Sequence, residues 1–589
     1  MANCICRRSS LEQASAAGLL VESGPGEHAF AHALVRQTIY AAHSSTRLAR
    51  LHRQLGEALE ALGDVDSHFE ALAHHFAEAA ADGEAVKAAT YALSAGRQAI
   101  TRLGYEDAAA HYERGLLALE RATPPDDGRR CELLIGLAEA RWSSGEMDEA
   151  RGAARLAADL ADMRGEPDLL ARAALGFAGP VRFEFSPSAT EPLIDLLKRA
   201  LKSLGRPESA LRARLLARLA LALEYAGSDQ RQPALAYEAL ELVRRVGDKP
   251  ELAEVLAASY AATRRPDNLD ERRTMAEELA LLAAEMGDRG LGALAANWIL
   301  TDLLERGDTE AAARELEALN RLAKQSRQRF ARFSAANARA RQAHLEGRLE
   351  DYEALGNELL ALGQEGQDET AMQAFGVQIL SLRREQGRLG ELVETVQTFA
   401  ERYPQITAWK STLALIFAEL DRRPDAQREL NVLARDDFKD LPRDWLWLLS
   451  IAVLSEVAAH LDDTRRAELL YELLLPYADR CLVVDGPFCQ GSASRPLGLL
   501  ATTIGNFNVA ARHFEDALEL NTRIESPLWT AHTKYDYAAT LLRRGEPSDR
   551  EHAFALLDAA LATADKLGLK ALADRVQRLK HRAEAAPSL

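Results

Sequence analysis

The sequence predicts an all-α protein, built as a solenoid of paired helices that stack in series. Three observations lead to this fold class. Alanine and leucine, which favour helices, dominate nearly every segment of the 589 residues. Sustained alternating runs of valine, isoleucine and threonine, which would indicate strands, do not occur. Glycines recur at a spacing close to 40 residues along much of the chain, as expected of a repeat protein.

The glycine spacing gives the length of the repeat. One series has steps of 40, 42 and 40 residues, a second has steps of 80, 40 and 40, and a last pair is again 40 apart. The first two series are offset by 20 residues. This offset predicts a helix, a turn, a second helix and a second turn in each repeat, because helices often end in a left-handed glycine. The glycines are Gly165, Gly205, Gly247 and Gly287; Gly227, Gly307, Gly347 and Gly387; and Gly505 and Gly545.

Apolar residues inside the repeats follow a helical period. In 234–246 and 272–286 they recur at i, i+3 or i+4, and i+7, so each segment has one face to bury. Pro233 suits the start of a helix, and Asp308 is a candidate helix cap. Because a single helical hairpin cannot cover its own apolar face, neighbouring repeats are expected to stack.

The clearest repeat signature is PLGLLATTIGNFNVAARHFEDALEL, at 496–520. Its spacing resembles the tetratricopeptide repeat, in which small residues let two helices approach and an aromatic residue fills the space between them. GYEDAAAHYERGLLAL, at 104–119, has residues at the same offsets. The resemblance covers most of 65–580, with a period longer than the usual repeat of about 34 residues. The candidate packing residues are Leu497, Gly498, Gly505, Ala510, Phe514 and Ala517, and in the second copy Ala108, Tyr112 and Gly115.

Two segments interrupt the helical pattern. Residues 478–496 (ADRCLVVDGPFCQGSASRP) collect Gly, Pro and Ser without a helical period, and 179–191 is a shorter gap. A loop as long as 478–496 is unusual in a packed array, so it is either functional or an insertion over the surface or a short extended piece. Trp445 and Trp447 lie two positions apart and cannot share one helix face. Either one of them is exposed at an interface or their helix is buried all round.

The N-terminal residues predict a small helix, a hairpin and a second helix. Residues 11–23 contain a short helix and the strand-like GLLVE, and EHAF (27–30) is the returning strand. The next helix carries Phe30, His32, Leu34, Arg36 and Tyr40 at its start and along its length. This pattern resembles the FxHALxRxxxY segment of bacterial STAND-class signal-transduction ATPases, the LuxR-type and adenylate-cyclase-linked regulators. In that class an ATPase core is followed by a winged helix and a long tetratricopeptide-like sensor.

The resemblance implies a role for two residues of this segment. His32 matches the histidine that senses the phosphates of bound nucleotide in related switch ATPases, so His32 and Arg36 are candidate vestigial nucleotide sensors. Ala31 and Ala33 flank the histidine where those proteins have Met and Asp, and His32 could instead be a helix-start histidine satisfied by local hydrogen bonds. A P-loop needs Gly-Lys before Ser or Thr, and this dipeptide occurs nowhere in the chain. The chain is therefore interpreted as a sensor region that lacks the ATPase core.

These patterns suggest four parts of the chain. They are a winged-helix remnant (1–45), the first helical repeats (46–125), tetratricopeptide-like repeats of about 40 residues (126–400), and C-terminal repeats (401–589) that contain the loop 478–496.

Composition and motifs exclude several function classes. The net charge of −17 argues against direct nucleic-acid binding, which needs a basic footprint. No apolar run has the length of a signal peptide or a membrane span, and the five scattered cysteines (Cys4, Cys6, Cys131, Cys481, Cys489) suit free thiols in a reducing cytoplasm. GxSxG, HExxH and CxxC are missing, so no catalytic residue is assigned.

No metal or other cofactor is predicted either. His74 and His75 are adjacent and point about 100° apart on a helix, so they do not easily bind one metal ion. His68 and His75 could share a face, but histidines of the core or its boundary are the simpler interpretation.

The leading functional interpretation is a non-enzymatic sensor and protein-interaction solenoid of a signal-transduction or transcription-regulatory ATPase system. Its concave groove would bind a protein, a peptide or a small effector. An ATPase or cyclase module would then act in trans, without a membrane. Two alternatives stay open: a free-standing tetratricopeptide adaptor or scaffold unrelated to an ATPase, and an enzyme with an unrecognised site, for example at 478–496.

Overall fold

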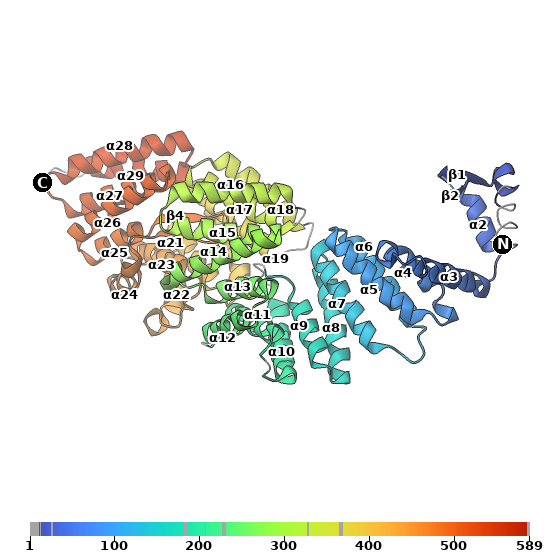
Figure 1. The fold of residues 1–589 in the computed structure, drawn as a ribbon. Helices are drawn as coiled ribbons and strands as arrows, with labels where there is room; N and C mark the ends of the chain where they lie inside the picture. Colours follow the sequence, from blue (N-terminus) through green and yellow to red (C-terminus); the bar gives the residue numbers. More distant parts are fainter. Residues whose placement is uncertain are drawn as a thin grey trace. The chain divides into compact units, whose positions relative to one another are not determined.

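The computed structural model describes residues 11, 13–24, 27–181, 187–206, 208–226, 231–326, 329–364 and 369–585. In these residues nearly all regular structure is helical, and the strands form two short hairpins, so the all-α helical-hairpin solenoid is confirmed. The chain divides into two compact units, Met1–Phe177 and Ala178–Leu589, which are coloured blue to cyan and green to red in Figure 1.

The first unit begins with a hairpin and continues as antiparallel helices. Consecutive helices pack on one another from α3 to α8, which is the stacking expected of repeat pairs. The elements are β1 (Leu20–Gly24), β2 (Glu27–Phe30), α2 (Ala33–Ala41), α3 (Ser45–Glu60), η1 (Val65–His68), α4 (Phe69–Glu78), η2 (Ala80–Asp82), α5 (Ala85–Thr101), α6 (Tyr105–Leu119), α7 (Asp127–Ser144), α8 (Met147–Arg164) and α9 (Pro167–Ala178).

Small residues set the spacing of the helices in this unit. The ring of Tyr112, on α6, is fully buried between Gly96 of α5 and Gly136 of α7. A Cβ atom at Gly96 would come within 2.4 Å of that ring, and one at Gly136 within 2.7 Å. Gly115 is equally tight against Leu133 and Ala92. The two glycines beside Tyr112 therefore provide the space that its large side chain fills.

The predicted N-terminal hairpin is present. Strands β1 and β2 pair antiparallel, with Leu20 opposite Phe30, and α2 follows directly. His32 is the N-cap of α2 and its side chain makes no capping hydrogen bond, while Arg36 is exposed on the same helix. The assignment of this part as a winged-helix remnant, and of His32 and Arg36 as nucleotide sensors, stays a prediction.

The second unit contains the longer series of helix pairs. Its first elements are α10 (Pro187–Leu204), α11 (Ala210–Ala226), α12 (Gln232–Val246), α13 (Lys249–Thr263), η3 (Pro266–Asn268), α14 (Leu269–Met286), α15 (Arg289–Glu305), α16 (Thr309–Gln325), α17 (Arg329–Leu345), α18 (Leu349–Gln364), α19 (Glu369–Glu385), η4 (Leu389–Leu392), α20 (Val393–Arg402), α21 (Thr407–Glu419) and α22 (Arg423–Leu433). It continues with η5 (Arg435–Phe438), α23 (Trp447–Leu461), α24 (Thr464–Leu474), η6 (Leu475–Tyr477), β3 (Cys481–Val483), β4 (Cys489–Ser492), α25 (Ser494–Ile504), α26 (Phe507–Arg523), α27 (Pro527–Arg544), α28 (Asp549–Leu567) and α29 (Lys570–Ala585).

The glycines of the predicted series end helices in the left-handed conformation. Their φ angles lie between 65° and 91°, where a side chain would be strained. Gly227 lies outside the described residues. The others are Gly165, Gly205, Gly247, Gly287, Gly307, Gly347, Gly387, Gly505 and Gly545.

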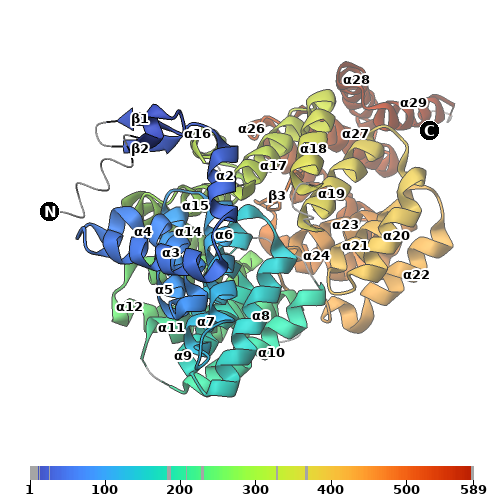
Figure 2. The same cartoon turned by 90° about the vertical axis from the view of Figure 1, so that its right-hand side faces the viewer.

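The last helices of the second unit contact helices from the middle of that unit. Helix α17 contacts α27, and α19 contacts α29. Figure 2 shows the C-terminal helices α27 to α29 in the same part of the second unit as α17 to α19. Ser526 Oγ donates to the carbonyl of Leu345 at 3.0 Å. A Cβ atom at Gly347 would lie 2.6 Å from Leu567 Cδ1, so this glycine serves both as a helix end and as a close contact with α28. The helices therefore form a closed arrangement in which residues about 200 positions apart touch.

The segment 478–496 is a short extended piece, one of the alternatives expected from the sequence, and not an insertion over the surface; its last three residues already belong to α25. It forms the antiparallel hairpin β3–β4, whose strand residues are all buried. Strand β3 contacts α15 and α23, and β4 contacts α17, α25, α26 and α27, so the hairpin lies between the middle and the C-terminal helices. Backbone pairing inside the hairpin and side-chain donors around it make this burial possible. The second gap, 179–191, is shorter than expected because α10 already begins at Pro187.

Among the described residues, no helix combines the length and the apolar character that crossing a bilayer requires.

Replacement of Phe514 by Ala tests the packing of the C-terminal repeat. Phe514 is fully buried on α26, against Gly498 of α25, where a Cβ atom would lie 2.7 Å from the ring. We expect Phe514→Ala to lower the free energy of unfolding by about 3–5 kcal/mol, because the removed ring leaves a cavity. Urea unfolding followed by circular dichroism measures this. The exposed Leu281→Ala is the control, expected to change stability by less than about 0.5 kcal/mol; equal effects of the two substitutions would contradict the packing.

Candidate functional site

The turn of the β3–β4 hairpin is held by a buried arginine. Arg341, on α17, is 1% exposed, and its Nη1 donates to the carbonyls of Val484 at 2.9 Å and Gly486 at 3.3 Å. The same nitrogen lies 3.3 Å from Thr301 Oγ1 on α15. One guanidinium therefore fixes the backbone of the turn against two helices of the middle repeats. Charged donors make the stronger hydrogen bonds, so this contact defines the position of the turn.

The strands of the hairpin are held from the other side by α26 and α27. Trp529 Nε1 donates to the carbonyl of Cys489 at 2.8 Å, and Asn521 Oδ1 accepts from the backbone N–H of Ser492 at 2.9 Å. Gly491, between them, has a φ of +71°, and a Cβ atom there would lie 2.7 Å from both Asn521 Oδ1 and Trp529 Cγ. Only glycine satisfies the conformation and the space at this position.

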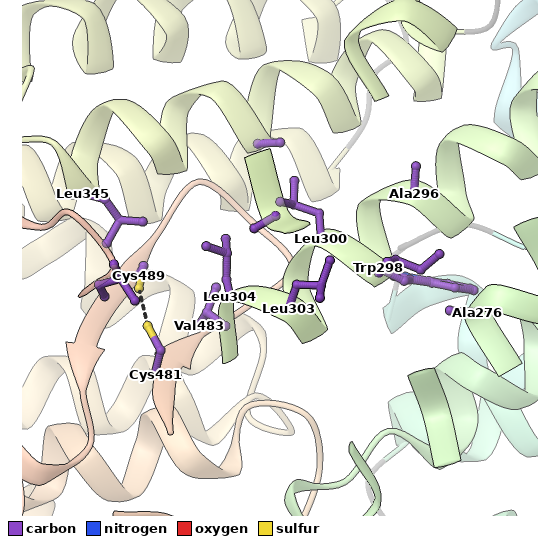
Figure 3. Close-up of a cluster of buried hydrophobic side chains, with 14 of the residues drawn as sticks. Ala276, Ala296, Trp298, Leu300, Leu303, Leu304, Leu345, Cys481, Val483 and Cys489 are labelled. Atoms are coloured by element: carbon purple, nitrogen blue, oxygen red, sulfur yellow. Dashed lines mark hydrogen bonds between the residues drawn. The ribbon is translucent and has the colours of Figure 1, made fainter. Parts of the chain in front are cut away.

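Apolar side chains surround the hairpin, as Figure 3 shows. Val483 and the two cysteines of the hairpin belong to the same buried cluster as Leu304 of α15 and Leu345 of α17. The Sγ atoms of Cys481 and Cys489 lie 3.2 Å apart as free thiols. The hydrogen bond that the Cys481 thiol donates to Cys489, together with burial, raises the pKa of Cys481 well above its usual range, so this thiol stays protonated.

A large pocket lies beside the turn of the hairpin. It has a cavity volume of about 180 Å³, and the turn residues 484–488 form one of its walls. Aromatic residues line much of the rest, and the rings of Tyr260 and Trp298 stack with their centroids 4.0 Å apart. Concave sites with apolar and aromatic walls are typical of small-molecule binding. The aromatic lining residues are Tyr260, Trp298, Phe330, Phe333, Trp409, Trp445 and Phe488.

Three amide side chains in the pocket have buried atoms without a hydrogen-bond partner among the described residues. They are Asn337 Oδ1, Gln373 Nε2 and Gln490 Oε1. The orientations of two are fixed by their other ends. Gln373 Oε1 accepts from Trp409 Nε1 at 3.4 Å, and Gln490 Nε2 donates to Glu456 Oε1 at 2.5 Å. The pocket therefore offers acceptors and a donor whose desolvation is not compensated within the protein, and a bound molecule or water would satisfy them.

The charged groups at the pocket pair with one another. Arg264 Nη1 lies 3.7 Å from Asp485 Oδ2, and Arg384 Nη2 lies 2.6 Å from Glu419 and 2.5 Å from Glu456. Burial alone would raise the pKa of Glu456, but Arg384 and Arg495 lower it well below its usual range. The carboxylates of Glu419 and Glu456 therefore remain ionised beside Arg384. Each charged residue among the described lining residues (Arg264, Arg384 and Asp485) thus has a partner of opposite sign.

The residues predicted from the sequence lie elsewhere. Leu497, Gly498, Ala510, Phe514 and Ala517 are buried in α25 and α26, while Gly505 ends α25. Ala108, Tyr112 and Gly115 are buried in α6 of the first unit, as described above. None of these residues lines the pocket.

Two features of the sequence lead to the pocket: the interruption at 478–496, whose residues 484–488 form one wall, and the tryptophan pair. Trp447 is buried, whereas Trp445 is half-buried, lies just before α23 and lines the pocket. The guanidinium of Arg264 lies 5.8 Å from the centroid of its ring. Tyr260, Trp298, Asn337 and Gln373 come from four different helices, and nothing in the sequence distinguishes them from ordinary core residues.

No protein-family model and no curated protein matches the sequence. Two solved structures are similar to the chain at 14% sequence identity and a TM-score of 0.29. The crystal structure of yeast Tom70 matches 85% of this chain and 98% of its own. The crystal structure of the APC/C hetero-tetramer Cut9-Hcn1 matches 82% of this chain and 95% of its own. Neither likeness identifies a function for the chain.

Replacement of Arg341 by Ala tests the anchoring of the hairpin. The change removes hydrogen bonds from a charged donor, worth about 1.5–3 kcal/mol each. The Gly486 carbonyl loses its Arg341 donor, and the Val484 carbonyl keeps only the backbone N–H of Gly486. We expect Cys481 and Cys489 to react with iodoacetamide at least about tenfold faster, because local opening exposes them. Peptide mass spectrometry measures the rate at each cysteine. The control is Arg339→Ala, on the same helix as Arg341, which removes a surface ion pair with Glu358 of α18. Unchanged labelling in Arg341→Ala would show that Arg341 does not hold the turn.

Proposed function

We propose that this chain is a non-enzymatic sensor whose second unit binds a small, uncharged, largely apolar or aromatic effector. The observation that supports this most directly is the set of unpartnered buried amide atoms on Asn337, Gln373 and Gln490 inside an aromatic pocket. A pocket that served only packing would be filled by side chains and would have its polar atoms paired. A ligand with one or two hydrogen-bonding groups and a flat apolar body matches both features.

A small effector fits this site better than a peptide or a protein. The space between the middle and the C-terminal helices, where a peptide would lie, is taken by the chain's own hairpin. The contact between Ser526 and the Leu345 carbonyl, and those of α17 with α27 and α19 with α29, close the arrangement around it. The pairing of the lining charges favours an uncharged ligand over an ionic one.

The hairpin links ligand binding in the pocket to the conformation of the C-terminal helices. Its turn is a wall of the pocket, and its strands are bonded to α26 and α27. A ligand that binds more tightly when the turn is in one of two positions increases the population of that position. The size of the shift is set by the difference between the two affinities. The C-terminal helices, which touch β4 directly, would respond first.

The first unit supports a partner that acts in trans. Its N-terminal hairpin and α2 expose large apolar side chains, with Leu34 72% exposed, as expected of a surface that another protein covers. With the resemblance to STAND-class regulators, this favours an ATPase or cyclase module as the partner in a signal-transduction or transcription-regulatory system. The exposed apolar residues are Val21, Phe30, Leu34, Ile39 and Tyr40.

A free-standing adaptor is the second candidate. It accounts equally well for a solenoid of helix pairs and for the exposed N-terminal side chains. It does not account for the unpartnered amides of the pocket. For both candidates a reducing cytoplasm is the expected compartment, because Cys481 and Cys489 are free thiols at 3.2 Å.

Binding of N-phenyl-1-naphthylamine, a neutral fluorescent aromatic amine, tests the pocket. We expect the full chain to bind this probe with increased fluorescence, since its rings match the aromatic walls and its N–H matches the free acceptors. Ala374→Trp, which fills the pocket, is expected to weaken binding at least about tenfold. The control is Leu281→Trp, at an exposed position outside the pocket. If the Ala374→Trp chain binds the probe as well as the control does, the pocket is not the binding site.

Replacement of Leu34 by Asp tests the proposed partner. The full chain is used as bait in a lysate of its native source, with ATP and ADP compared, and captured proteins are identified by mass spectrometry. We expect capture of a P-loop ATPase or a cyclase-linked ATPase, and its loss with Leu34→Asp, because a charge at a covered apolar position is costly. The exposed Leu281→Asp is the control. Capture that does not depend on Leu34, or capture of proteins without a nucleotide-binding module, would favour the adaptor.

A further inference from the structure

Three histidines of the first unit face one another across two helices. His52 lies on α3, and His74 and His75 lie on α4. The ring centroids of His52 are 5.6 Å from His74 and 5.0 Å from His75, and those of His74 and His75 are 5.3 Å apart. One ring nitrogen from each residue lies within 4.8 Å of the other two.

We propose that His52, His74 and His75 bind a divalent transition-metal ion, with zinc the best match. A tetrahedral zinc ion with nitrogen ligands at about 2.0–2.1 Å has these ligands about 3.3 Å from one another. The nitrogens of the cluster bracket this separation: His52 Nδ1 and His75 Nδ1 are 2.8 Å apart, and all three lie within 4.8 Å. Small rotations of the side chains therefore bring the three lone pairs to one point.

The hydrogen bonds around His52 suit a metal ligand. Its Nδ1 faces His75, and its Nε2 lies 3.2 Å from the hydroxyl of Tyr40 on α2. With the metal on Nδ1, the proton of the ring is on Nε2 and is donated to the Tyr40 oxygen. An outer partner of this kind orients the imidazole and fixes its tautomer.

The donor set indicates which ions fit. Three imidazole nitrogens suit zinc, copper or nickel, whereas magnesium and calcium require oxygen ligands. His52 is buried, His75 is half-buried and His74 is exposed, so a fourth ligand position faces solvent on the side of His74. The ion would join α3 to α4 and, through Tyr40, support α2. The site is separate from the pocket of the second unit and does not depend on the effector proposed above.

Titration with metal ions tests the site. The full chain, purified with a tag that contains no histidine and stripped with a chelator, is titrated with Zn²⁺ and with Co²⁺. We expect one ion per chain at this site, with a visible Co²⁺ spectrum of nitrogen coordination and no thiolate charge-transfer band. His74→Ala, whose exposed side chain is not needed for packing, should lower the Zn²⁺ affinity by more than the roughly 100-fold that loss of an outer partner can cause.

His68→Ala is the matched control. His68 lies six residues before His74, and its ring is within 2.5 Å of Ser67 Oγ rather than in the cluster. We expect its Zn²⁺ affinity to equal that of the unmodified chain, and Zn²⁺ to slow amide hydrogen exchange in α3 and α4 of both. Equal affinities of His74→Ala and His68→Ala, a thiolate band with Co²⁺, or no bound ion in the unmodified chain would each overturn the proposal.

Discussion

The architecture of the second unit depends on one contact, the guanidinium of Arg341 against the carbonyls of Val484 and Gly486. A hairpin inside a helical array brings unpaired backbone groups into an apolar interior, which is costly unless each finds a partner. Arg341 supplies the partner for the turn, and Trp529 and Asn521 supply those for the strands. With these donors and acceptors in place, the hairpin can connect the middle helices to the C-terminal ones.

This arrangement also explains the composition of the pocket. The hairpin turn occupies part of the interior but does not fill it, so aromatic side chains from several repeats line the remaining space. The buried ion pairs of Arg264 with Asp485 and of Arg384 with Glu456 neutralise the charges that close the site. What remains is an apolar space with the unpartnered amide atoms of Asn337, Gln373 and Gln490 as its polar contacts, and specificity would come from those groups.

Much of the fold is visible in the sequence because helix pairing is local. Amphipathic periods and left-handed glycines act within some 20 residues, and the helices end where Gly247, Gly287 and Gly545 predicted. The hairpin at 478–496 could only be seen as an interruption, since its strands are stabilised by residues such as Arg341, about 140 positions away. The histidine cluster could not be predicted from the sequence for a similar reason. His74 and His75 are adjacent on α4, and the third member of the cluster comes from α3, which brings the ring of His52 to 5.6 Å from His74 and 5.0 Å from His75.

The sequence alone determined that this protein is an all-α solenoid with helix pairs of nearly constant length and without a P-loop, because each of these properties is set by nearby residues. The tertiary structure decided where the interior lies and what lines it. Tyr260, Asn337, Gln373 and Gln490 come from separate parts of the chain, and closure of the helices around the hairpin brings them together. No local pattern encodes that closure, because it results from contacts between residues far apart in the chain, such as Ser526 with Leu345.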